Sequence, residues 1–465
     1  MQSPHPLEIP ELVSLVIAYL PPSRLPAYAR VSKLWYQVCS PIIWKDINLI
    51  RLPESTALIQ RCCHVVKKVT IGSLSQESAA IRFPNLGSLE LNTEFRKDFH
   101  IQFVMAHPTI TDLVMNDSYC CQPPFWDALL GFHNLRTLSM SSHEIFGQNI
   151  DKFWQLCMRL ERLDIQVQHN RFPRVILPEK ELSNIKHIGV NGCYANNIPL
   201  FIEFLRRCPG LTSLRWRSRR RYEKAFVSKF STFLEAHELF YLEHLDLGAR
   251  LTPRELLTKV IRNMPQITTL SLMATYYMHY RIDFAALQPY FTSLRVLELF
   301  LEKGVDTHMA QDILSSCPLL EKLVAPCVDA DVITQGKPWV CLELRFLELA
   351  FCFIPPNTVS TLQPLVFDRL SKLTQLEEWR IIGSSHLGGH VDLRIQSGLD
   401  KLSTLRELHT VIAYDVVEMM GDAEVDWIVN HWKRLRVFNG KLNTCDAVGE
   451  ALRRRMWDRG ISVIR

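Results

Sequence analysis

Two histidines with a spacing used by metal sites occur in the stretch "HLGGH". His386 and His390 lie four residues apart, which on a helix places both imidazoles on one face, as zinc binding requires. Gly388 and Gly389 stand between them and disfavour a helix, and no third ligand accompanies the pair. We therefore interpret the stretch as a loop and expect no metal site.

Cysteine is the other residue type that could support chemistry, because the chain contains 13 cysteines. None forms the CxxC spacing of zinc and redox motifs, and no cysteine–histidine pair indicates a protease or ligase. The thiols are interpreted as reduced, apolar core groups, which is typical of the cytoplasm or nucleus. The chain also lacks a P-loop, a GxSxG motif and a GxGxxG motif. We expect no enzyme and no cofactor.

Arginines gather in "RWRSRRRYEK", residues 215–224, the densest basic cluster in the chain. A guanidinium pairs with phosphate or carboxylate through two parallel hydrogen bonds, so one interpretation is capture of a phosphorylated or acidic motif. In the alternative, Arg215 pairs with Asp246 on an adjacent strand, and the remainder is a solvated loop or a nuclear-localisation run. The sequence leaves both interpretations open.

The overall charge does not favour nucleic acid. The chain has 53 basic and 48 acidic residues, a net charge of +5, so no global attraction to a polyanion follows. The aromatic run "YYMHYR", residues 276–281, has the chemistry to stack on bases but lacks a matching basic groove, so we interpret it as a loop. We expect no nucleic-acid partner.

One short sequence pattern, called the phrase below, recurs along the chain. The elements that it forms must position the arginines and the other side chains described above. Its last two apolar residues lie two apart, so both face the same side of a β-strand. Counting weaker versions, roughly fifteen copies occur about 20 to 32 residues apart, around the period of leucine-rich repeats. The clearest are "FPNLGSLELN" from Phe83, "HPTITDLVMN" from His107, "FHNLRTLSMS" from Phe132, "CPGLTSLRWR" from Cys208, "MPQITTLSLM" from Met264, "FTSLRVLELF" from Phe291 and "CPLLEKLVAP" from Cys317.

Between the phrases the apolar period becomes helical. In "LTPRELLTKVIRNMP", Thr252 and Glu255 form a capping box, and Pro253 takes the first helical position. "NIPLFIEFLRRCP" and "DTHMAQDILSSCP" repeat the scheme. Units this short bury their apolar faces only by stacking on neighbours, which predicts an α/β solenoid.

The pattern resembles the leucine-rich-repeat family in its cysteine-containing form, with "CP" before the first leucine. The resemblance covers about residue 63 to the C-terminus and implies a horseshoe with parallel strands on the concave face and helices outside. A longer βα barrel is the alternative architecture. After the strand the family usually has Asn or Cys; this chain has Cys193, Cys352, Glu94, His143, Arg219 and Glu302. We assign 49–442 to the solenoid and 443–465 to a capping helix and strand.

The first forty or so residues lack the repeat and predict three short helices. Ile9, Leu12, Val13, Val16, Ile17 and Leu20 form an apolar stripe that ends at "PPS". A second helix is expected at about 25–31, and a third from about Ser32 carries Trp35 and ends before Pro41. Such a segment is near the lower size limit for an independent core, so a partner surface is expected to stabilise it.

This segment, residues 5–48, resembles an F-box. The family pattern is Leu-Pro-x-Glu, an Ile/Leu pair, "YLP", a leucine, Val-x-x-x-Trp and a final Leu-Trp. The chain departs from it where Glu11 follows Pro10 directly, and at Ser23-Arg24, where the family commonly has an aspartate. The matching residues are Ile9 to Leu12, Ile17, Tyr19 to Pro21, Leu25, Val31 to Trp35, and Ile43-Trp44.

The resemblance implies docking onto the adaptor subunit of an SCF-type ubiquitin ligase and, through it, association with cullin and RING subunits. In the alternative, the segment caps a non-catalytic scaffold or inhibitor that binds a protein partner directly. Carried over by position, the residues that pack at the adaptor interface or support it are Pro10, Leu12, Ile17, Leu20, Leu25, Val31 and Trp35.

The solenoid would then present a substrate protein through residues that alternate with the core leucines, and the arginine cluster leaves open whether that protein is phosphorylated or acidic. Leu214 and Trp216 are predicted to point inward. The tentative substrate-binding residues are Ser213, Arg215, Arg217, Arg219, Asp246, Glu298 and Phe300. The N-terminus lacks a basic n-region, and the apolar run 9–20 is too short to span a bilayer, so no membrane partner is expected.

Overall fold

The computed structural model covers residues 1–465 and divides into two units, Met1–Leu211 and Thr212–Arg465. Predictions on Glu94, His143, Arg219, Thr252, Glu255, Glu302 and His386 lie outside the residues that the structure describes. The described residues are 6–20, 24–49, 56–72, 74–92, 98–116, 123–141, 149–166, 180–193, 198–218, 232–233, 239–249, 264, 266–274, 285, 287–300, 307–381, 390–414 and 416–464.

The first unit begins with the predicted all-helical module. Its elements are the 3-10 turn η1 (Pro6–Glu8) and helices α1 (Pro10–Ala18), α2 (Leu25–Tyr28) and α3 (Lys33–Ile43). The Ser32 Oγ caps α3 by accepting a hydrogen bond from the Trp35 N–H at 3.3 Å. Contrary to expectation, α3 continues past Pro41. A proline in the last turn removes only one backbone hydrogen bond, so the helix tolerates it.

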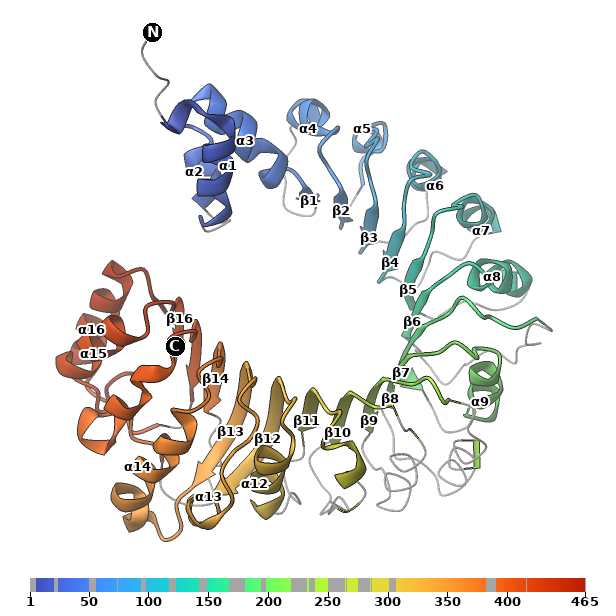
Figure 1. Ribbon diagram of the computed structural model, residues 1–465. Coiled ribbons are helices and arrows are strands. Elements are labelled where there is room, and N and C mark those ends of the chain that lie inside the picture. The colour runs from blue at the N-terminus through green and yellow to red at the C-terminus, as the bar shows by residue number, and fades with distance from the viewer. Residues whose placement is uncertain are drawn as a thin grey trace. The chain divides into compact units, whose positions relative to one another are not determined.

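The remainder of the first unit is a ladder of parallel strands that pair in chain order. The strands are β1 (Asp46–Asn48), β2 (Lys68–Ile71), β3 (Ser88–Leu91), β4 (Asp112–Met115), β5 (Thr137–Ser141), β6 (Arg162–Gln166) and β7 (His187–Cys193). The helices that follow these strands are α4 (Thr56–Cys62), α5 (Gln76–Ala79), α6 (Asp98–Met105), α7 (Pro123–Leu130), α8 (Ile150–Cys157) and α9 (Ile198–Arg206). Within this unit the helices lie outside the strands (Figure 1).

The second unit repeats the same parallel ladder. Its strands are β8 (Ser213–Ser218), β9 (His244–Ala249), β10 (Thr269–Ala274), β11 (Val296–Phe300), β12 (Lys322–Asp329), β13 (Phe346–Cys352), β14 (Glu378–Ile381), β15 (Thr410–Ala413), β16 (Val437–Asn439) and β17 (Ser462–Ile464). Its helices include η6 (Gln288–Tyr290), α12 (Thr307–Ser316), α13 (Ala330–Gln335), η7 (Pro356–Thr358), α14 (Val359–Leu370), η8 (Ile395–Ser397), η9 (Leu399–Thr404), α15 (Asp422–His431) and α16 (Asp446–Asp458). Thus α16 and β17 occupy the segment for which a terminal helix and strand were predicted.

Strand register explains why the repeated phrase builds a core. Leu89, Leu113 and Leu138 lie opposite one another on β3, β4 and β5 and are fully buried. Each strand therefore buries alternate side chains against the helix layer, and full burial of one leucine contributes about 1.5–3 kcal/mol. At the end of the strands Asn116 Nδ2 donates a hydrogen bond to Asn92 Oδ1 at 2.6 Å. The prediction of a solenoid is confirmed in both units. We call the face of the strands that is turned away from the helices the concave face.

Candidate functional site

Helix α1 is apolar on two opposite faces. Val13 and Ile17 are buried in the module core together with Leu25, Trp35 and Cys39. On the other face, side chains at helical spacings of three and four remain in solvent. These are Leu12 at 39% exposure, Leu15 at 60%, Val16 at 39% and Tyr19 at 89%. We name these four residues the α1 stripe.

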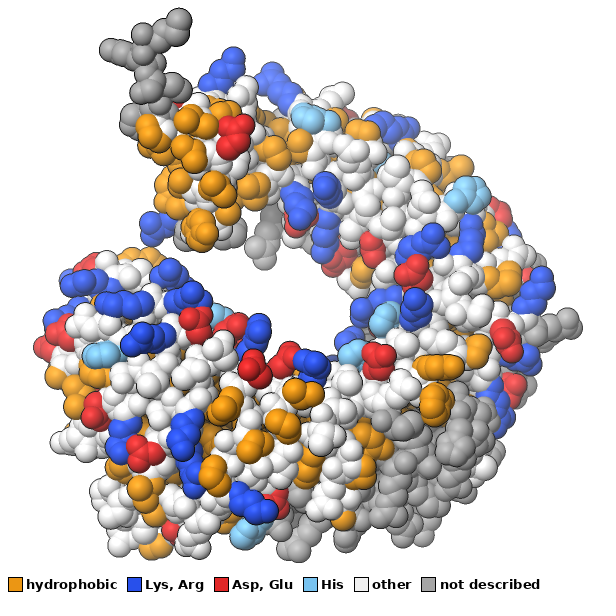
Figure 2. Space-filling model, viewed as in Figure 1, with side chains coloured by type: hydrophobic (Ala, Val, Ile, Leu, Met, Phe, Trp, Pro, Cys, Tyr) orange, Lys and Arg blue, Asp and Glu red, His pale blue; other side chains and the backbone are white. Residues whose placement is uncertain are grey.

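The α1 stripe has the character of a docking surface. A helix that is apolar all round is usually buried on all sides, whereas α1 packs on one side only. The N-terminal module carries a gathering of hydrophobic side chains on its surface (Figure 2). Scattered single apolar residues are normal on a protein surface, but a contiguous patch marks an interaction site.

Strand β8 presents the arginines that were singled out as substrate-binding. Leu214 and Trp216 are fully buried, so Ser213, Arg215 and Arg217 lie on the concave face, as predicted. The register places Arg215 directly opposite Asp246 of β9. Asp246 Oδ2 lies 3.2 Å from Arg215 Nε and 2.8 Å from Arg217 Nη2. The ion pair of Arg215 with Asp246, which the sequence analysis gave as the alternative to capture of a phosphorylated or acidic motif, is therefore present, and Arg217 joins it.

A second polar cluster lies on the concave face of β11 to β14. Lys322 Nζ is 2.7 Å from Glu298 Oε1, and it lies 4.5 Å from the centroid of the Phe346 ring. On the other side of that ring Arg380 lies 4.9 Å from the centroid and pairs with Glu348 at 3.3 Å. Burial raises the pKa of Glu348 above its ordinary value. Glu298 belongs to this cluster, and Phe300 lies half-buried two residues further along β11 on the same strand face.

Comparison with known proteins accounts for the N-terminal module, because residues 7–46 match the F-box domain. The chain combines an F-box domain with leucine-rich repeats. No curated protein matches the chain.

Among solved structures, the chain is similar to several at low sequence identity. A chain of the TLR13–ssRNA13 complex has 14% identity, covers 81% of this chain with 45% of its own length, and gives a TM-score of 0.35. The leucine-rich-repeat-containing protein LegL7 from Legionella pneumophila has 15% identity and a TM-score of 0.33. The match covers 70% of this chain and 97% of that protein. A chain of the Rad7 and Elc1 complex from yeast has 14% identity and a TM-score of 0.42. The match covers 98% of this chain and 93% of that chain.

The seven residues carried over from the F-box pattern separate into two groups. Pro10, Leu12 and Val31 are exposed, and Leu20 is half-buried. Ile17, Leu25 and Trp35 are buried in the core of the F-box and support its surface from within. Leu15 and Tyr19, the most exposed members of the α1 stripe, are not among these seven residues, although Tyr19 belongs to the matching pattern. Projecting the sequence onto a helix of 3.6 residues per turn would have separated the two faces.

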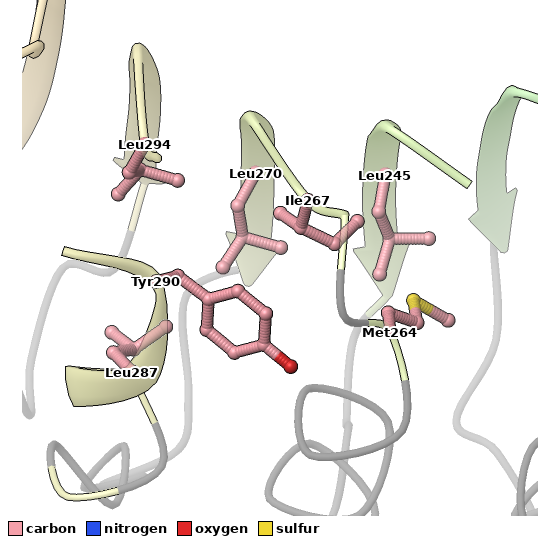
Figure 3. A pocket seen from close by; sticks show the side chains of 7 residues that line it. All are labelled: Leu245, Met264, Ile267, Leu270, Leu287, Tyr290 and Leu294. Atoms are coloured by element: carbon pink, nitrogen blue, oxygen red, sulfur yellow. The ribbon is translucent and has the colours of Figure 1, made fainter. Parts of the chain in front are cut away.

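A small apolar cavity lies in the core of the second unit. It measures about 10 Å³ and is lined by Leu245, Met264, Ile267, Leu270, Leu287, Tyr290 and Leu294 (Figure 3). A void of this size holds about one water molecule at most, and water needs several polar partners. We interpret the cavity as imperfect packing between β9, β10 and η6.

Three of the described thiols lie deep in the core of the repeats. Burial raises the pKa of Cys208, Cys317 and Cys341 to about 12 each, so these thiols are neutral packing groups. Within the described ranges no three His, Cys, Asp or Glu side chains are grouped so as to hold a metal ion. Over the same ranges, no helix combines the length and apolar character needed to cross a bilayer.

Proposed function

We propose that this protein is a substrate-recognition subunit of an SCF-type cullin–RING ubiquitin ligase. The F-box docks onto the adaptor subunit, which links the chain to the cullin and RING subunits. The concave face of the repeats binds a substrate protein. In this role the chain does no chemistry itself and brings its substrate near an enzyme bound elsewhere in the assembly.

The single observation that supports adaptor docking is the exposed α1 stripe within the matched F-box. Removing apolar surface from water contributes about 25 cal/mol per Å², so covering four large apolar side chains provides a substantial driving force for association. Among the residues that the structure describes, the module's own core has five buried residues, with partly buried apolar side chains packed against them. A partner that covers the α1 stripe would therefore also stabilise the F-box fold.

The first prediction tests this docking surface. Replacing Leu15 with Glu and Tyr19 with Ala removes exposed apolar contacts and leaves the buried core of the F-box unchanged. We expect co-purification of the adaptor to fall by at least about tenfold, because a buried unpaired charge and a lost aromatic contact each cost more than about 1 kcal/mol.

A matched control is Leu365→Glu, which changes an exposed leucine on helix α14 of the second unit. This variant should retain the adaptor at the wild-type level. Undiminished adaptor binding by the Leu15→Glu, Tyr19→Ala variant would remove the proposed interface.

One observation favours the alternative role of the module as a cap on a protein-binding scaffold. Strand β1, which follows α3 directly, pairs in parallel with β2 of the repeats. The Lys45 carbonyl also accepts hydrogen bonds from the Lys67 and Lys68 N–H groups at 2.8 and 3.0 Å. In a cap, the residues before β1 would be inseparable from the stability of the repeats and would bind no adaptor.

A further inference from the structure

Strand β12 contains a bulge that reverses the direction in which its last residues point. Its register with β13 shifts from Val324 opposite Glu348 to Cys327 opposite Ala350, so β12 has one residue more than β13 over this stretch. Because successive side chains of a strand alternate between its two faces, one extra residue exchanges those faces. Leu323 points into the core, and a regular strand would direct Cys327 there too. The bulge instead places Cys327 on the concave face.

On this face Cys327 lies beside a second thiol. Leu349 and Phe351 of β13 are buried in the core of the repeats, so Ala350 and Cys352, which alternate with them, lie on the concave face. Cys327, Ala350 and Cys352 form a small cluster of their own. The side chain of Cys352 hydrogen-bonds to the Cys327 thiol. Two thiols that are far apart in sequence are therefore neighbours in space.

The pairing between β12 and β13 extends beyond their pairing with the strands on either side. Over the described ranges, β11 pairs with β12 as far as Val324, and β14 pairs with β13 as far as Glu348. Beyond these two residues the ladder that contains Cys327 and Cys352 joins β12 to β13. A two-stranded end has fewer ladder hydrogen bonds than the rest of the sheet, so its backbone adjusts more easily. The two sulfurs can therefore move from a hydrogen-bonding contact to the length of a covalent S–S bond.

Of the two thiols, Cys327 is suited to act as the nucleophile. The hydrogen bond from Cys352 lowers the pKa of the Cys327 thiol below its ordinary value of 9.0, although burial and the negative charge of Asp329 both raise it. In the core of the same unit, burial raises the pKa of Cys317 and Cys341 to about 12. Because the thiolate is the reactive species, Cys327 reacts at neutral pH under conditions that leave the core thiols unreactive.

The burial of the pair selects a small reaction partner. Cys327 is 8% exposed and Cys352 is 3% exposed. A hydroperoxide such as hydrogen peroxide is little larger than water, whereas a bulky disulfide such as oxidised glutathione needs a wider approach to the sulfur atom. The same burial keeps other thiols away from an oxidised Cys327, so the sulfur of Cys352 is its nearest reaction partner.

We propose that Cys327 and Cys352 form a reversible oxidation site at which a hydroperoxide converts the two thiols into a disulfide. The Cys327 thiolate attacks one peroxide oxygen, the O–O bond breaks, and the other oxygen leaves as an alkoxide that takes up a proton; Cys327 becomes a sulfenic acid. The sulfur of Cys352 then attacks the sulfur of Cys327 and expels hydroxide, which becomes water with the proton of the Cys352 thiol. Two thiols thus lose two electrons, and the peroxide is reduced to one alcohol and one water. This inference does not depend on the proposed function.

The test maps the cysteines of the full-length protein after treatment with hydrogen peroxide. The remaining thiols are blocked with N-ethylmaleimide, and the protein is digested and analysed by mass spectrometry without reduction. We expect the peptides of Cys327 and Cys352 to be joined in the most abundant cross-link. That cross-link should be absent before treatment and lost after addition of dithiothreitol. Cys317 and Cys341 should remain reduced at the same peroxide concentration.

Two variants assign the roles of the sulfur atoms. Cys352→Ser removes the second thiol, so Cys327 should stop at the sulfenic acid and be captured by dimedone. Cys327→Ser should give neither a disulfide nor a dimedone adduct at Cys352. The matched control is Cys445→Ser, which removes an exposed thiol and should leave the Cys327–Cys352 cross-link at its wild-type level.

A wild-type protein whose Cys327 stays reduced while the exposed Cys445 is oxidised would overturn the inference. Cross-links that join Cys327 mainly to other cysteines would also overturn it. A dimedone adduct on Cys352 in Cys327→Ser, or faster oxidation by oxidised glutathione than by hydrogen peroxide, would contradict the assigned nucleophile and oxidant. Mapping of the wild type decides the existence of the site even if a serine variant fails to fold. Adaptor co-purification, measured on the untreated protein, tests the proposed function separately.

Discussion

Asp392 shows how single residues stabilise the repeats of the second unit. Its carboxylate accepts hydrogen bonds from Arg394 Nη2 at 2.7 Å and from Ser397 Oγ at 2.6 Å, and the residue is almost fully buried. Gln363 donates to the Asp392 carbonyl and accepts from its N–H, both at 2.7 Å. Burial by itself would raise the pKa of this carboxyl, but the hydrogen bonds of Arg394 and Ser397 outweigh it and hold the pKa below its ordinary value of 3.8.

At the residue scale we predict that Asp392→Asn destabilises the protein by about 2 kcal/mol at pH 7, because Arg394 loses its buried partner. A carboxyl whose pKa is lowered by folding contributes stability above pH 3.8, and that contribution is lost as the pH falls through the folded pKa. The difference between wild type and variant should therefore shrink in acid. Thermal unfolding measured from pH 7 downward checks this.

The control for this pH dependence is Asp368→Asn. Asp368 pairs with Lys401 at 2.8 Å, but its side chain is half exposed, and exposed ion pairs contribute little. Its thermal midpoint should stay close to that of the wild type throughout. If the difference in stability between wild type and Asp392→Asn stays constant as the pH falls, the charge of Asp392 is not the cause of that difference.

At the scale of elements, glycines set how strands and helices end. Gly440, directly after β16, has a φ of +150°, and a Cβ atom there would lie 2.4 Å from the Ala413 carbonyl oxygen of β15. Gly460, after α16, has a φ of +81° with nothing within 4 Å of that position. It ends the helix by donating its N–H to the Trp457 carbonyl at 2.8 Å. Of these two glycines, Gly440 combines a positive φ with close backbone contact and Gly460 does not.

The two glycines therefore give a paired prediction. Gly460→Ala should cost about 1 kcal/mol, the price of a left-handed conformation for an alanine. Gly440→Ala should cost about 3 kcal/mol, because its strained conformation is combined with a clash against an adjacent strand. Thermal unfolding of the two variants measures the difference, and equal losses would refute the role of the Ala413 contact.

At the scale of the whole molecule, the two proposed binding surfaces belong to different units. The F-box, residues 7–46, lies in the first unit, and the arginines of β8 lie in the second. A solenoid is stabilised mainly by contacts between neighbouring repeats, so loss of one end is transmitted weakly to distant repeats. Adaptor docking and substrate capture should therefore be separable.

We predict that deletion of residues 1–44, which leaves β1 in place, abolishes adaptor binding and leaves the repeats folded. Co-purification with the adaptor and thermal unfolding measure the two properties on one preparation. The Leu15→Glu, Tyr19→Ala variant is the control, because it should lose the adaptor without shortening the chain. Unfolding of the repeats in the deletion would instead favour the module as a structural cap.

Local pattern was sufficient to predict the repeats. The phrase around Leu89 and its counterparts alternates apolar and polar residues with period two, and "NIPLFIEFLRRCP" has helical spacing; both depend only on neighbours in sequence. The same alternation predicted correctly that Leu214 and Trp216 point inward. The prediction that the third helix ends before Pro41 was wrong. A helix tolerates a proline in its last turn, and the local pattern does not show where that turn lies.

The sequence by itself determined the class of the protein: an F-box pattern in an ordered series of residues, followed by stacked repeats. Only the tertiary structure decided which apolar residues of α1 remain exposed, since Ile17 is covered by packing and Leu15 is not. It also decided that Arg217 joins Arg215 on Asp246 across the backbone of Gly248. Such contacts join residues about 30 positions apart, and their geometry follows from strand register and packing, which no local pattern contains.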